Sequence, residues 1–449
     1  MVLVGILIFL SHKNIFIQDG TIDYTRPGYN IILISVDTLR ADHLYCYGYE
    51  RETSPNIDRI AREALLFENA ISQSAWTLPS HASLMTGLLP SEHGLIYYDE
   101  DGLQNKTMIG ILNRDIPTLA QVLKRQGYLN ISFNAGAWVD ENFGLDSGFH
   151  IYQWGGRYFK DNVTHSLKWI QNNIQSKFFL FLHAYDVHTP YNASKKFNIF
   201  YDYQGQYEMN QIKPSMIESL SSPEYKYIIS QYDAGIRRAD YYLGLLFDLL
   251  DKENLMDRTI IIITSDHGEM LKKLHDKWGH IYPLYEELIK VPVIIRIPGV
   301  KSERIKNQVP GSISIAPTVL DILDIKNKDF NFDNSLMNFF SKKEFCFDYI
   351  LSETGRVRKE RLCRAIRTDK WKLMFYTQGN KMPRCELFDL ENDKAEQDDI
   401  AKENPDKVRE LLNRLLSTIE EIPSGKAKEA ALSKSTIEQL KALGYIKDK

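Results

Sequence analysis

Five short apolar runs, separated by much longer segments, constrain the fold of this chain more than any other feature of its sequence. The runs are residues 30–36 (NIILISV), 129–134 (LNISFN), 178–183 (FFLFLH), 259–264 (TIIIIT) and 291–297 (VPVIIRI). They are almost wholly apolar, which is typical of parallel strands that helices cover on both faces. Amphipathic patterns in the gaps predict helices at residues 56–65, 116–127, 162–174, 225–250 and 313–323. Alternating strands and helices predict an α/β fold with a large, doubly wound, mostly parallel sheet.

The pattern changes towards the C-terminus. Residues 361–376 and 386–390 alternate like short strands, and helical patterns follow at residues 405–419 and 436–443. We interpret this part as a smaller subdomain, an antiparallel sheet plus helices, packed on the α/β domain. The predicted organisation is therefore an N-terminal segment and tether at residues 1–28, the α/β domain at 29–340 and the C-terminal subdomain at 341–449.

The N-terminal segment opens with nine apolar residues at positions 2–10 (VLVGILIFL). A helix that spans a bilayer needs roughly 20 such residues, so this run is too short to do so alone. It resembles the apolar part of a signal peptide, but no basic residue precedes it and no small-residue cleavage site follows. Membrane tethering, export and a plain extension of a cytoplasmic protein are all compatible with it.

Composition excludes several classes of protein. The chain of 449 residues carries 55 Lys and Arg against 59 Asp and Glu, a net charge of −4, which gives no electrostatic reason to bind nucleic acid. Its four cysteines are too few and too scattered for a disulfide framework or a Cys-rich zinc site, although Cys363 and Cys385 flank a predicted hairpin and could pair in an oxidising compartment. An ordinary globular enzyme or binding protein remains.

Polar side chains with metal-binding chemistry follow three of the apolar runs. They are Asp37 after the first run, His183, Asp186 and His188 around the end of the third, and Asp266 and His267 after the fourth. One such residue alone is more often a helix cap or a loop histidine. Three groups at one sheet edge favour a ligand site, because open α/β sheets bind ligands beyond the carboxyl ends of their strands. Carboxylates with imidazoles suit Zn²⁺, Mn²⁺, Mg²⁺ or Ca²⁺, and the absence of thiolates argues against soft-metal or redox sites.

A second constellation is residues 76–87 (WTLPSHASLMTG). Thr77 lies two residues before Pro79, which favours the start of a helix there. The Thr77 hydroxyl would then lie at a helix N-terminus, which attracts anions; a plain helix cap is the alternative. A hydroxyl becomes a nucleophile at neutral pH when a base or a metal lowers its pKa, and the Asp/His cluster would supply that metal.

These residues resemble a known family. The segments that carry the resemblance are VDTLRADHLYCYGY (36–49), SPNIDRIA (54–61), WTLPSHASLMTGLLPSEHG (76–94), SDHGEML (265–271), WGHIYPLYEELIKVPVIIRIPG (278–299), IAPTVLDIL (315–323), ELFDLENDKAEQDD (386–399) and IEQLKALGYI (437–446). Together they are similar to the sulfatase family of the alkaline phosphatase superfamily, in order, over about residues 29 to 447.

The resemblance implies roles for individual residues. Asp37, Asp266 and His267, together with Thr77, would bind a divalent cation, and Thr77 would be the nucleophile. His188 and His280 would contact the ester's anionic oxygens or its leaving group. Further substrate-binding candidates are Arg40, His81, which stands where the family has an arginine, and more weakly Lys290. Asp186, His188 and His280 could hold a second metal, but a hydrogen-bonding clamp on the substrate is favoured, and His183 and His275 are interpreted as structural.

The departures from the family decide the predicted reaction. Sulfatases carry Cys or Ser followed by x-P-x-R, and that residue is oxidised to formylglycine; here the positions are Thr77 and His81. The methyl group on the threonine β-carbon would allow a ketone at best. The usual Asp-Asp pair is Asp37-Thr38, and the family's Gly-Lys-Trp-His-type substrate element is absent around residues 133–140.

A metal-activated threonine resembles the phosphodiesterase, nucleotide pyrophosphatase and phosphoglycerol-transferase branches of the superfamily. We therefore predict a metal-dependent hydrolase of phosphoric or phosphonic esters, with a covalent intermediate on Thr77 and a small-molecule, glycan or lipid ester as substrate. The alternatives are a sulfuric ester hydrolase working without formylglycine, a membrane-tethered phospho-headgroup transferase, and a binding protein without catalysis.

Overall fold

The computed structural model describes residues 28–98, 108–205, 207–212, 216, 220–271, 275, 278–356, 360–443 and 445–446. The apolar run at residues 2–10 lies outside these ranges. Among the helices in the described ranges, none combines the length and the apolar character that crossing a bilayer requires.

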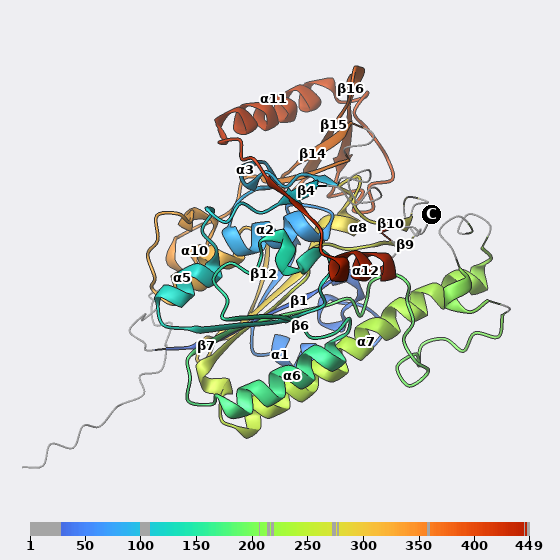
Figure 1. Ribbon diagram of the computed structural model, residues 1–449. Coiled ribbons are helices and arrows are strands. Elements are labelled where there is room, and N and C mark those ends of the chain that lie inside the picture. The colour runs from blue at the N-terminus through green and yellow to red at the C-terminus, as the bar shows by residue number, and fades with distance from the viewer. Residues whose placement is uncertain are drawn as a thin grey trace, which may run out of the picture.

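An eight-stranded mixed sheet forms the centre of the molecule, with strand order β12-β2-β11-β8-β1-β7-β5-β6 (Figure 1). The strands are β1 (Asn30–Val36), β2 (Leu65–Ile71), β5 (Leu129–Asn134), β6 (Ile151–Trp154), β7 (Phe178–Ala184), β8 (Thr259–Thr264), β11 (Lys290–Arg296) and β12 (Glu303–Pro310). All neighbours pair in parallel except β11, which runs antiparallel to both β2 and β8. The predicted large, mostly parallel sheet is confirmed.

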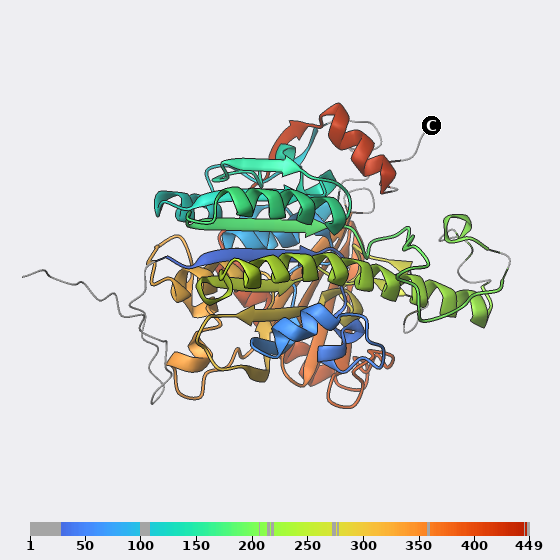
Figure 2. The same cartoon turned by 90° about the horizontal axis from the view of Figure 1, so that it is seen from below.

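Helices cover both faces of this sheet, as the apolar strands require. One face packs against α1 (Pro55–Ala61), α6 (Phe159–Asn172) and α7 (Ser222–Lys252); the other packs against α2 (Thr77–Thr86), α5 (Leu119–Arg125) and α9 (Ile315–Ile322). In β1, Ile32 and Ile34 point into the first core, whereas Ile31 and Leu33 point into the second. Figure 2 shows α6 (green) and the long helix α7 (yellow-green) lying across the first face.

The apolar runs at residues 30–36, 129–134 and 259–264 coincide with β1, β5 and β8. Strands β2, β6 and β12 were not predicted, and the predicted helix at residues 56–65 is too long, because α1 ends at Ala61 and β2 begins at Leu65. Both β6 and β12 lie at sheet edges, where one side of the strand has no neighbour and polar residues are tolerated. They therefore lack the continuous apolar run of a central strand.

A second sheet lies at the C-terminal side, in the order β16-β15-β14-β13-β3 (Figure 1). Its strands are β13 (Ile350–Arg356), β14 (Arg361–Arg367), β15 (Trp371–Gln378) and β16 (Lys381–Asp389), all antiparallel, with β3 (Tyr97–Tyr98) parallel to β13. Helix α11 (Pro405–Glu421) packs on it through Leu411 and Leu415. All four cysteines are free, and Cys363 and Cys385 lie on opposite sides of β15, so the possible disulfide does not form.

The end of the chain leaves this second sheet and returns to the α/β domain. Strand β17 (Lys428–Ala431) pairs with β4 (Met108–Ile111), and α12 (Lys434–Ala442) packs against the short helix η3 (Ala137–Val139). In Figure 1, α12 (dark red) lies apart from α11 and β14–β16. The predicted subdomain at residues 341–449 thus divides structurally, with its last part on the α/β domain.

Shorter elements connect these layers. They are η1 (Ala41–His43), η2 (Tyr45–Tyr47), α3 (Pro90–His93), η4 (Glu141–Phe143), η5 (Met209–Gln211), η7 (Met256–Arg258), β9 (Met270–Leu271), β10 (Trp278–Gly279), α8 (Glu286–Ile289), η8 (Phe332–Asn334) and α10 (Asn338–Ser341).

Candidate active site

Two neighbouring parallel strands carry a cluster of acidic and imidazole groups at their carboxyl ends. Asp37 follows β1 directly, and Asp266 and His267 follow β8, which lies beside β1 with Ser35 opposite Thr264. One ligand atom from each of Asp37, Asp266 and His267 lies within 4.8 Å of the others, and all three residues are fully buried. The sheet edge therefore holds the group of residues that the strand ends predict.

The ionisation of this cluster is far from that of exposed groups. Burial, together with the adjacent Asp266 carboxylate, holds the pKa of Asp37 well above its usual range. Burial also opposes ionisation of Asp266, but the surrounding His267, His81 and His183 outweigh it and lower the pKa of that carboxyl. Burial lowers the pKa of His267 to about 4, so its ring is neutral at neutral pH, the form that binds metals.

The donor atoms fit a divalent cation. Oδ1 of Asp37 and Oδ2 of Asp266 are buried and have no hydrogen-bond partner among the described residues. His267 donates its Nδ1 hydrogen to the carbonyl of Gly268 at 2.8 Å, which leaves the Nε2 lone pair facing Oδ2 of Asp266 at 3.3 Å. Two carboxylates and an imidazole that converge, with one oxygen of each carboxylate unpartnered among the described residues, are a donor set for a hard or borderline cation.

The hydroxyl of Thr77 lies within this cluster. Helix α2 begins at Thr77, whose Oγ1 is 3.3 Å from Oδ2 of Asp37 and 3.3 Å from Nε2 of His267. The residue is fully buried. A hydroxyl at the first residue of a ten-residue helix also faces the positive end of the helix dipole, which favours an incoming anion.

A second polar cluster lies beside the first. The rings of His267 and His280 are 4.6 Å apart, and Nε2 of His280 lies 2.7 Å from the hydroxyl of Tyr445. The same hydroxyl lies 3.0 Å from Nε2 of His188. On its other side, Nδ1 of His280 meets the buried carboxylate of Glu269 at 3.1 Å. The two histidines that the resemblance assigns to the ester are therefore adjacent, with the Tyr445 hydroxyl between them.

The directions of these hydrogen bonds follow from the groups that only accept. Nδ1 of His188 contacts the carbonyl of Thr189 at 2.5 Å, so Nδ1 carries the hydrogen. Burial and the neighbouring His280 lower the pKa of His188, so its Nε2 is an acceptor and takes the hydrogen of Tyr445. Nδ1 of His280 faces the carboxylate of Glu269, which only accepts, so Nδ1 carries a hydrogen and the Tyr445 hydroxyl lies between the two Nε2 atoms with one hydrogen to give.

Three residues that are not glycine have left-handed backbone conformations around the two clusters. Thr38, next to Asp37, has φ of 57°, Ile281, next to His280, has φ of 89°, and Ala137 of η3 has φ of 52°. This region is costly for side chains with a branched β-carbon. The Ile281 backbone is held by hydrogen bonds to Ala75 and Thr354, so the surrounding structure fixes the direction of His280.

Three of the predicted substrate-binding residues are engaged elsewhere. His81 donates through Nδ1 to the carbonyl of Thr77 at 2.8 Å and accepts from Ser35 at Nε2, 3.0 Å away, so both ring nitrogens are in use. Arg40 is buried and its guanidinium binds Asp42, Glu287 and the carbonyl of Glu269. Lys290 donates to Asn69. We do not carry these three residues into the proposed site.

The alternative of a second metal on Asp186, His188 and His280 does not match the geometry either. Both carboxylate oxygens of Asp186 accept hydrogen bonds, from Nε of Arg238 at 2.6 Å and from the backbone N–H of Phe159 at 2.7 Å. Asp186 is thus a structural residue that fixes the loop after β7. His275 is structural too, since it stacks on Tyr285 and contacts Glu287.

Sequence reasoning missed three residues of the site. His183 was interpreted as structural, yet its Nε2 lies 3.3 Å from Oδ2 of Asp37, and it pairs with Ser35 in the adjacent strand. Its place at the end of β7 is the signal that could have found it. Glu269 follows His267 by two residues, and Tyr445 lies in the closing segment that carries part of the resemblance; neither position alone indicates a contact with His280.

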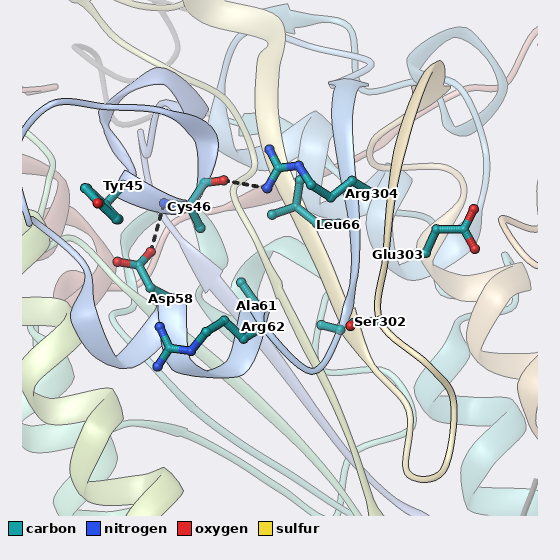
Figure 3. A pocket seen from close by; sticks show the side chains of 10 residues that line it. Tyr45, Cys46, Asp58, Ala61, Arg62, Leu66, Ser302, Glu303 and Arg304 are labelled. Carbon is teal, nitrogen blue, oxygen red and sulfur yellow. Dashed lines mark hydrogen bonds between the residues drawn. The ribbon is translucent and has the colours of Figure 1, made fainter.

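A separate cavity of about 510 Å³ lies between η2, α1, β2 and the start of β12 (Figure 3). Its polar groups contact one another: Asp58 accepts from the Cys46 N–H at 3.0 Å, and Arg304 donates to the Cys46 carbonyl at 2.9 Å. None of the residues predicted for the site lines it.

The family follows from comparison with known proteins. Residues 29–325 match the family described as "Sulfatase", and residues 273–423 match "N-sulphoglucosamine sulphohydrolase, C-terminal". The first match alone covers more than half of the chain. This protein belongs to the sulfatase family. The resemblance found in the sequence is thereby confirmed at the level of the family.

Relatives span nearly the whole of this sulfatase-family chain. An arylsulfatase of Clostridium perfringens is 24% identical over 87% of this chain and 95% of its own length. Among solved structures, the phosphonate monoester hydrolase of Agrobacterium radiobacter has a TM-score of 0.69 at 17% identity, covering 90% of this chain and 97% of its own. A structure in complex with its substrate D-glucosamine-2-N,6-O-disulfate has a TM-score of 0.68 at 19% identity, covering 88% and 98%. The sulfatase-family fold therefore includes proteins named for sulfuric and for phosphonic esters.

Proposed function

We propose that this protein is a metal-dependent hydrolase that cleaves phosphoric or phosphonic esters with Thr77 as its nucleophile. The observation that carries the proposal is the position of the Thr77 hydroxyl, 3.3 Å from both a carboxylate oxygen of Asp37 and Nε2 of His267. A buried hydroxyl among unsatisfied cation ligands, at the start of a helix, has the surroundings that a nucleophile for a charged ester requires.

Each residue has a role in this proposal. Asp37, Asp266 and His267 would hold the cation together with Thr77. When bound, the cation would lower the pKa of the Thr77 hydroxyl and offset the negative charge of the transferred group. Thr77 would give its hydroxyl hydrogen to Oδ2 of Asp37, and its Oγ1 would form a bond to phosphorus while the bond from phosphorus to the leaving oxygen breaks. Water would release the group from Thr77, and His183 would hold Asp37 in place through its Nε2.

His188 and His280 would form a hydrogen-bonding clamp on the ester. Both present Nε2 to the same point, at 3.0 and 2.7 Å from the Tyr445 oxygen. A leaving-group oxygen near that point would lie within reach of both rings. Glu269 behind His280 fixes the orientation of its ring.

The chemistry of threonine favours phosphorus over sulfur. Formylglycine releases sulfate through a hydrate that eliminates, and a sulfated threonine has no such route. The similarity in fold to the phosphonate monoester hydrolase of Agrobacterium radiobacter is compatible with this preference. We further propose a small-molecule or glycan ester as the substrate, since one structural neighbour binds a sulfated glucosamine.

Sulfuric ester hydrolysis without formylglycine is the second candidate. It is favoured by the match of residues 29–325 to the sulfatase family and by the similarity to an arylsulfatase of Clostridium perfringens. The two candidates share the fold and the cation cluster, so they differ only in the ester that Thr77 attacks.

Purified protein assayed on 4-nitrophenyl phosphate, bis(4-nitrophenyl) phosphate, 4-nitrophenyl phenylphosphonate and 4-nitrophenyl sulfate separates the two. We expect turnover of a phosphorus ester that chelator abolishes and that Zn²⁺, Mn²⁺, Mg²⁺ or Ca²⁺ restores. Faster turnover of the sulfate would support the second candidate instead.

The nucleophile is tested by Thr77→Ala, which should reduce turnover by about a thousandfold or more, while Thr77→Ser should keep a measurable fraction. The matched control is Thr86→Ala at the other end of α2, where the hydroxyl donates to the Ala82 carbonyl at 2.7 Å and accepts from the Leu88 N–H at 3.3 Å, away from the cluster. Activity of Thr77→Ala close to that of Thr86→Ala would exclude Thr77 as the nucleophile.

A further inference from the structure

The hydroxyl of Tyr445 is the one group that contacts both histidines of the proposed clamp among the described residues. It lies 3.0 Å from Nε2 of His188 and 2.7 Å from Nε2 of His280. Tyr445 comes from the end of the chain, more than 150 residues beyond His280 in sequence. A contact that joins such distant segments requires the C-terminal segment, residues 433–446, to be held in a defined place.

Specific polar contacts hold that segment on the loop after β5. The Ala137 N–H donates to Oε1 of Gln439 at 2.7 Å, and Thr436 donates to Asp140 at 3.0 Å. Gly136 makes room for this contact, since a β-carbon there would lie 2.2 Å from Oε1 of Gln439. Hydrogen bonds from side chains and from the backbone therefore hold the segment on this loop.

Apolar packing joins the same segment to the start of α2. Leu440, Leu443 and Ile446 are buried in one cluster with Trp76, the residue before Thr77, and with Trp138. The rings of Trp138 and Tyr445 contact edge to face at 5.5 Å. Figure 1 shows α12 away from the C-terminal sheet and from α11, which precede it in sequence. The segment thus belongs structurally to the wall of the site.

The hydrogen inventory gives the Tyr445 hydroxyl a direction. It donates its one hydrogen towards Nε2 of His188, at 3.0 Å, and its oxygen lies 2.7 Å from Nε2 of His280. Rotation about the bond from the ring to the oxygen would redirect the donated hydrogen to another acceptor. An ester oxygen placed in the clamp would be such an acceptor.

We propose that Tyr445 is a further substrate-contacting residue, which donates its hydroxyl hydrogen to the leaving-group oxygen of the ester. As the bond between phosphorus (or sulfur) and that oxygen breaks, the oxygen takes the hydrogen of Tyr445, which leaves a phenolate oxygen beside the two histidines. The leaving group departs as a neutral alcohol, and Tyr445 regains a hydrogen from water. The inference rests on the proposed function and adds to it the residue that protonates the leaving group.

The test is Tyr445→Phe, which removes the hydroxyl and keeps the ring against Trp138. The assay is a series of esters of the acid that the enzyme cleaves fastest, with leaving groups from 4-nitrophenol to phenol and an alkyl alcohol. A nitrophenolate leaves without a proton, so we expect less than a tenfold loss of kcat there. An alkoxide needs one, and we expect a loss of about a hundredfold or more with the alkyl ester. Tyr349→Phe is the matched control, since the Tyr349 hydroxyl contacts Thr418 of α11, away from the site, and it should change neither value.

Three results would overturn the inference: equal losses for all leaving groups, no loss, or a lower KM with unchanged kcat, which would show that substrate merely displaces Tyr445. Gln439→Ala gives an independent check. Loosening α12 should produce the same dependence of kcat on the leaving group, and the double variant with Tyr445→Phe should lose no more activity than Tyr445→Phe alone. Failure of the proposed function is distinguishable, since Thr77→Ala would then keep its activity on the nitrophenyl ester whatever Tyr445→Phe does.

Discussion

Replacing Asp37 by Asn should stabilise the protein when metal is withheld and abolish its stabilisation by metal. Ligand atoms of Asp37 and Asp266 lie within 4.8 Å of one another in a fully buried site. Two full negative charges at that separation repel by about 3.5 kcal/mol at an effective dielectric constant of about 20. Proton uptake relieves part of this repulsion, as the raised pKa of Asp37 indicates.

We therefore expect Asp37→Asn to raise the free energy of unfolding in chelator by about 2–3 kcal/mol. The direction of the Asp37 pKa shift also predicts how the free energy of unfolding depends on pH. Because the pKa of Asp37 is higher in the folded protein than in the unfolded chain, its contribution to stability is greatest at acidic pH and is lost as pH rises. The metal-free wild type should lose stability above the ordinary titration range of aspartate, and Asp37→Asn should lose less.

The assay is urea unfolding in chelator and with added cation. Cation at about 100 times its Kd should stabilise the wild type by about 2.7 kcal/mol and leave Asp37→Asn almost unchanged. The matched control is Asp186→Asn, a buried carboxylate that is already paired with Arg238 at 2.6 Å; it should lose about 3–5 kcal/mol in either condition. The reasoning is refuted if Asp37→Asn is destabilised in chelator like Asp186→Asn and still responds fully to cation.

Three further predictions follow from the fold and the seating of the C-terminal segment. Lys372→Met should cost about 3–5 kcal/mol in urea unfolding. It leaves the buried carboxylate of Glu396, now 2.7 Å from the ammonium, without its cation, and Glu286 keeps only Arg367. Lys370→Met at the surface is the control and should leave the free energy of unfolding almost unchanged. Burial lowers the pKa of His93 to about 3. Its contribution to stability is therefore present above about pH 6.5 and is lost as pH falls towards 3. In the variant His93→Gln, the free energy of unfolding should change less with pH over that range. Gly136→Ala should impair turnover of alkyl esters, because the new β-carbon meets Gln439. The control is Gly127→Ala, which also has positive φ but open space around it; it should lower only the free energy of unfolding, by about 1 kcal/mol. Equal turnover of alkyl esters by the two variants would contradict the role of α12.

The sheet centre was predictable because burial on both faces leaves a strong pattern. The runs that became β1 and β8 contain almost no polar residue, and their ends fix where Asp37 and Asp266 lie. Strand β12 (ERIKNQVP) carries charges on its exposed side and so lacks that pattern. The start of α2 was predictable from the turn chemistry of Trp76 to Pro79, since the helix does begin at Thr77.

The clamp was only partly predictable, for a physical reason. His188 and His280 have ring nitrogens whose partners depend on the path of the last residues of the chain, and the sequence holds no local signal that sends Tyr445 back to the α/β domain. The position of His81 in its motif does not reveal that its ring turns back to the Thr77 carbonyl on its own helix, four residues away. Side-chain direction and long-range docking are properties of the packed fold and not of the pattern.

The covalent attachment of substrate to Thr77 tests the central claim most directly. Protein mixed with excess substrate, quenched in acid within milliseconds and digested, should yield the peptide that contains Thr77 with the mass of the transferred group added, and fragmentation should place that mass on the Thr77 side chain. The same adduct should be absent after chelation and in Thr77→Ala. An active wild type that shows no adduct on Thr77 at any quench time, or an adduct on another residue, would contradict the account.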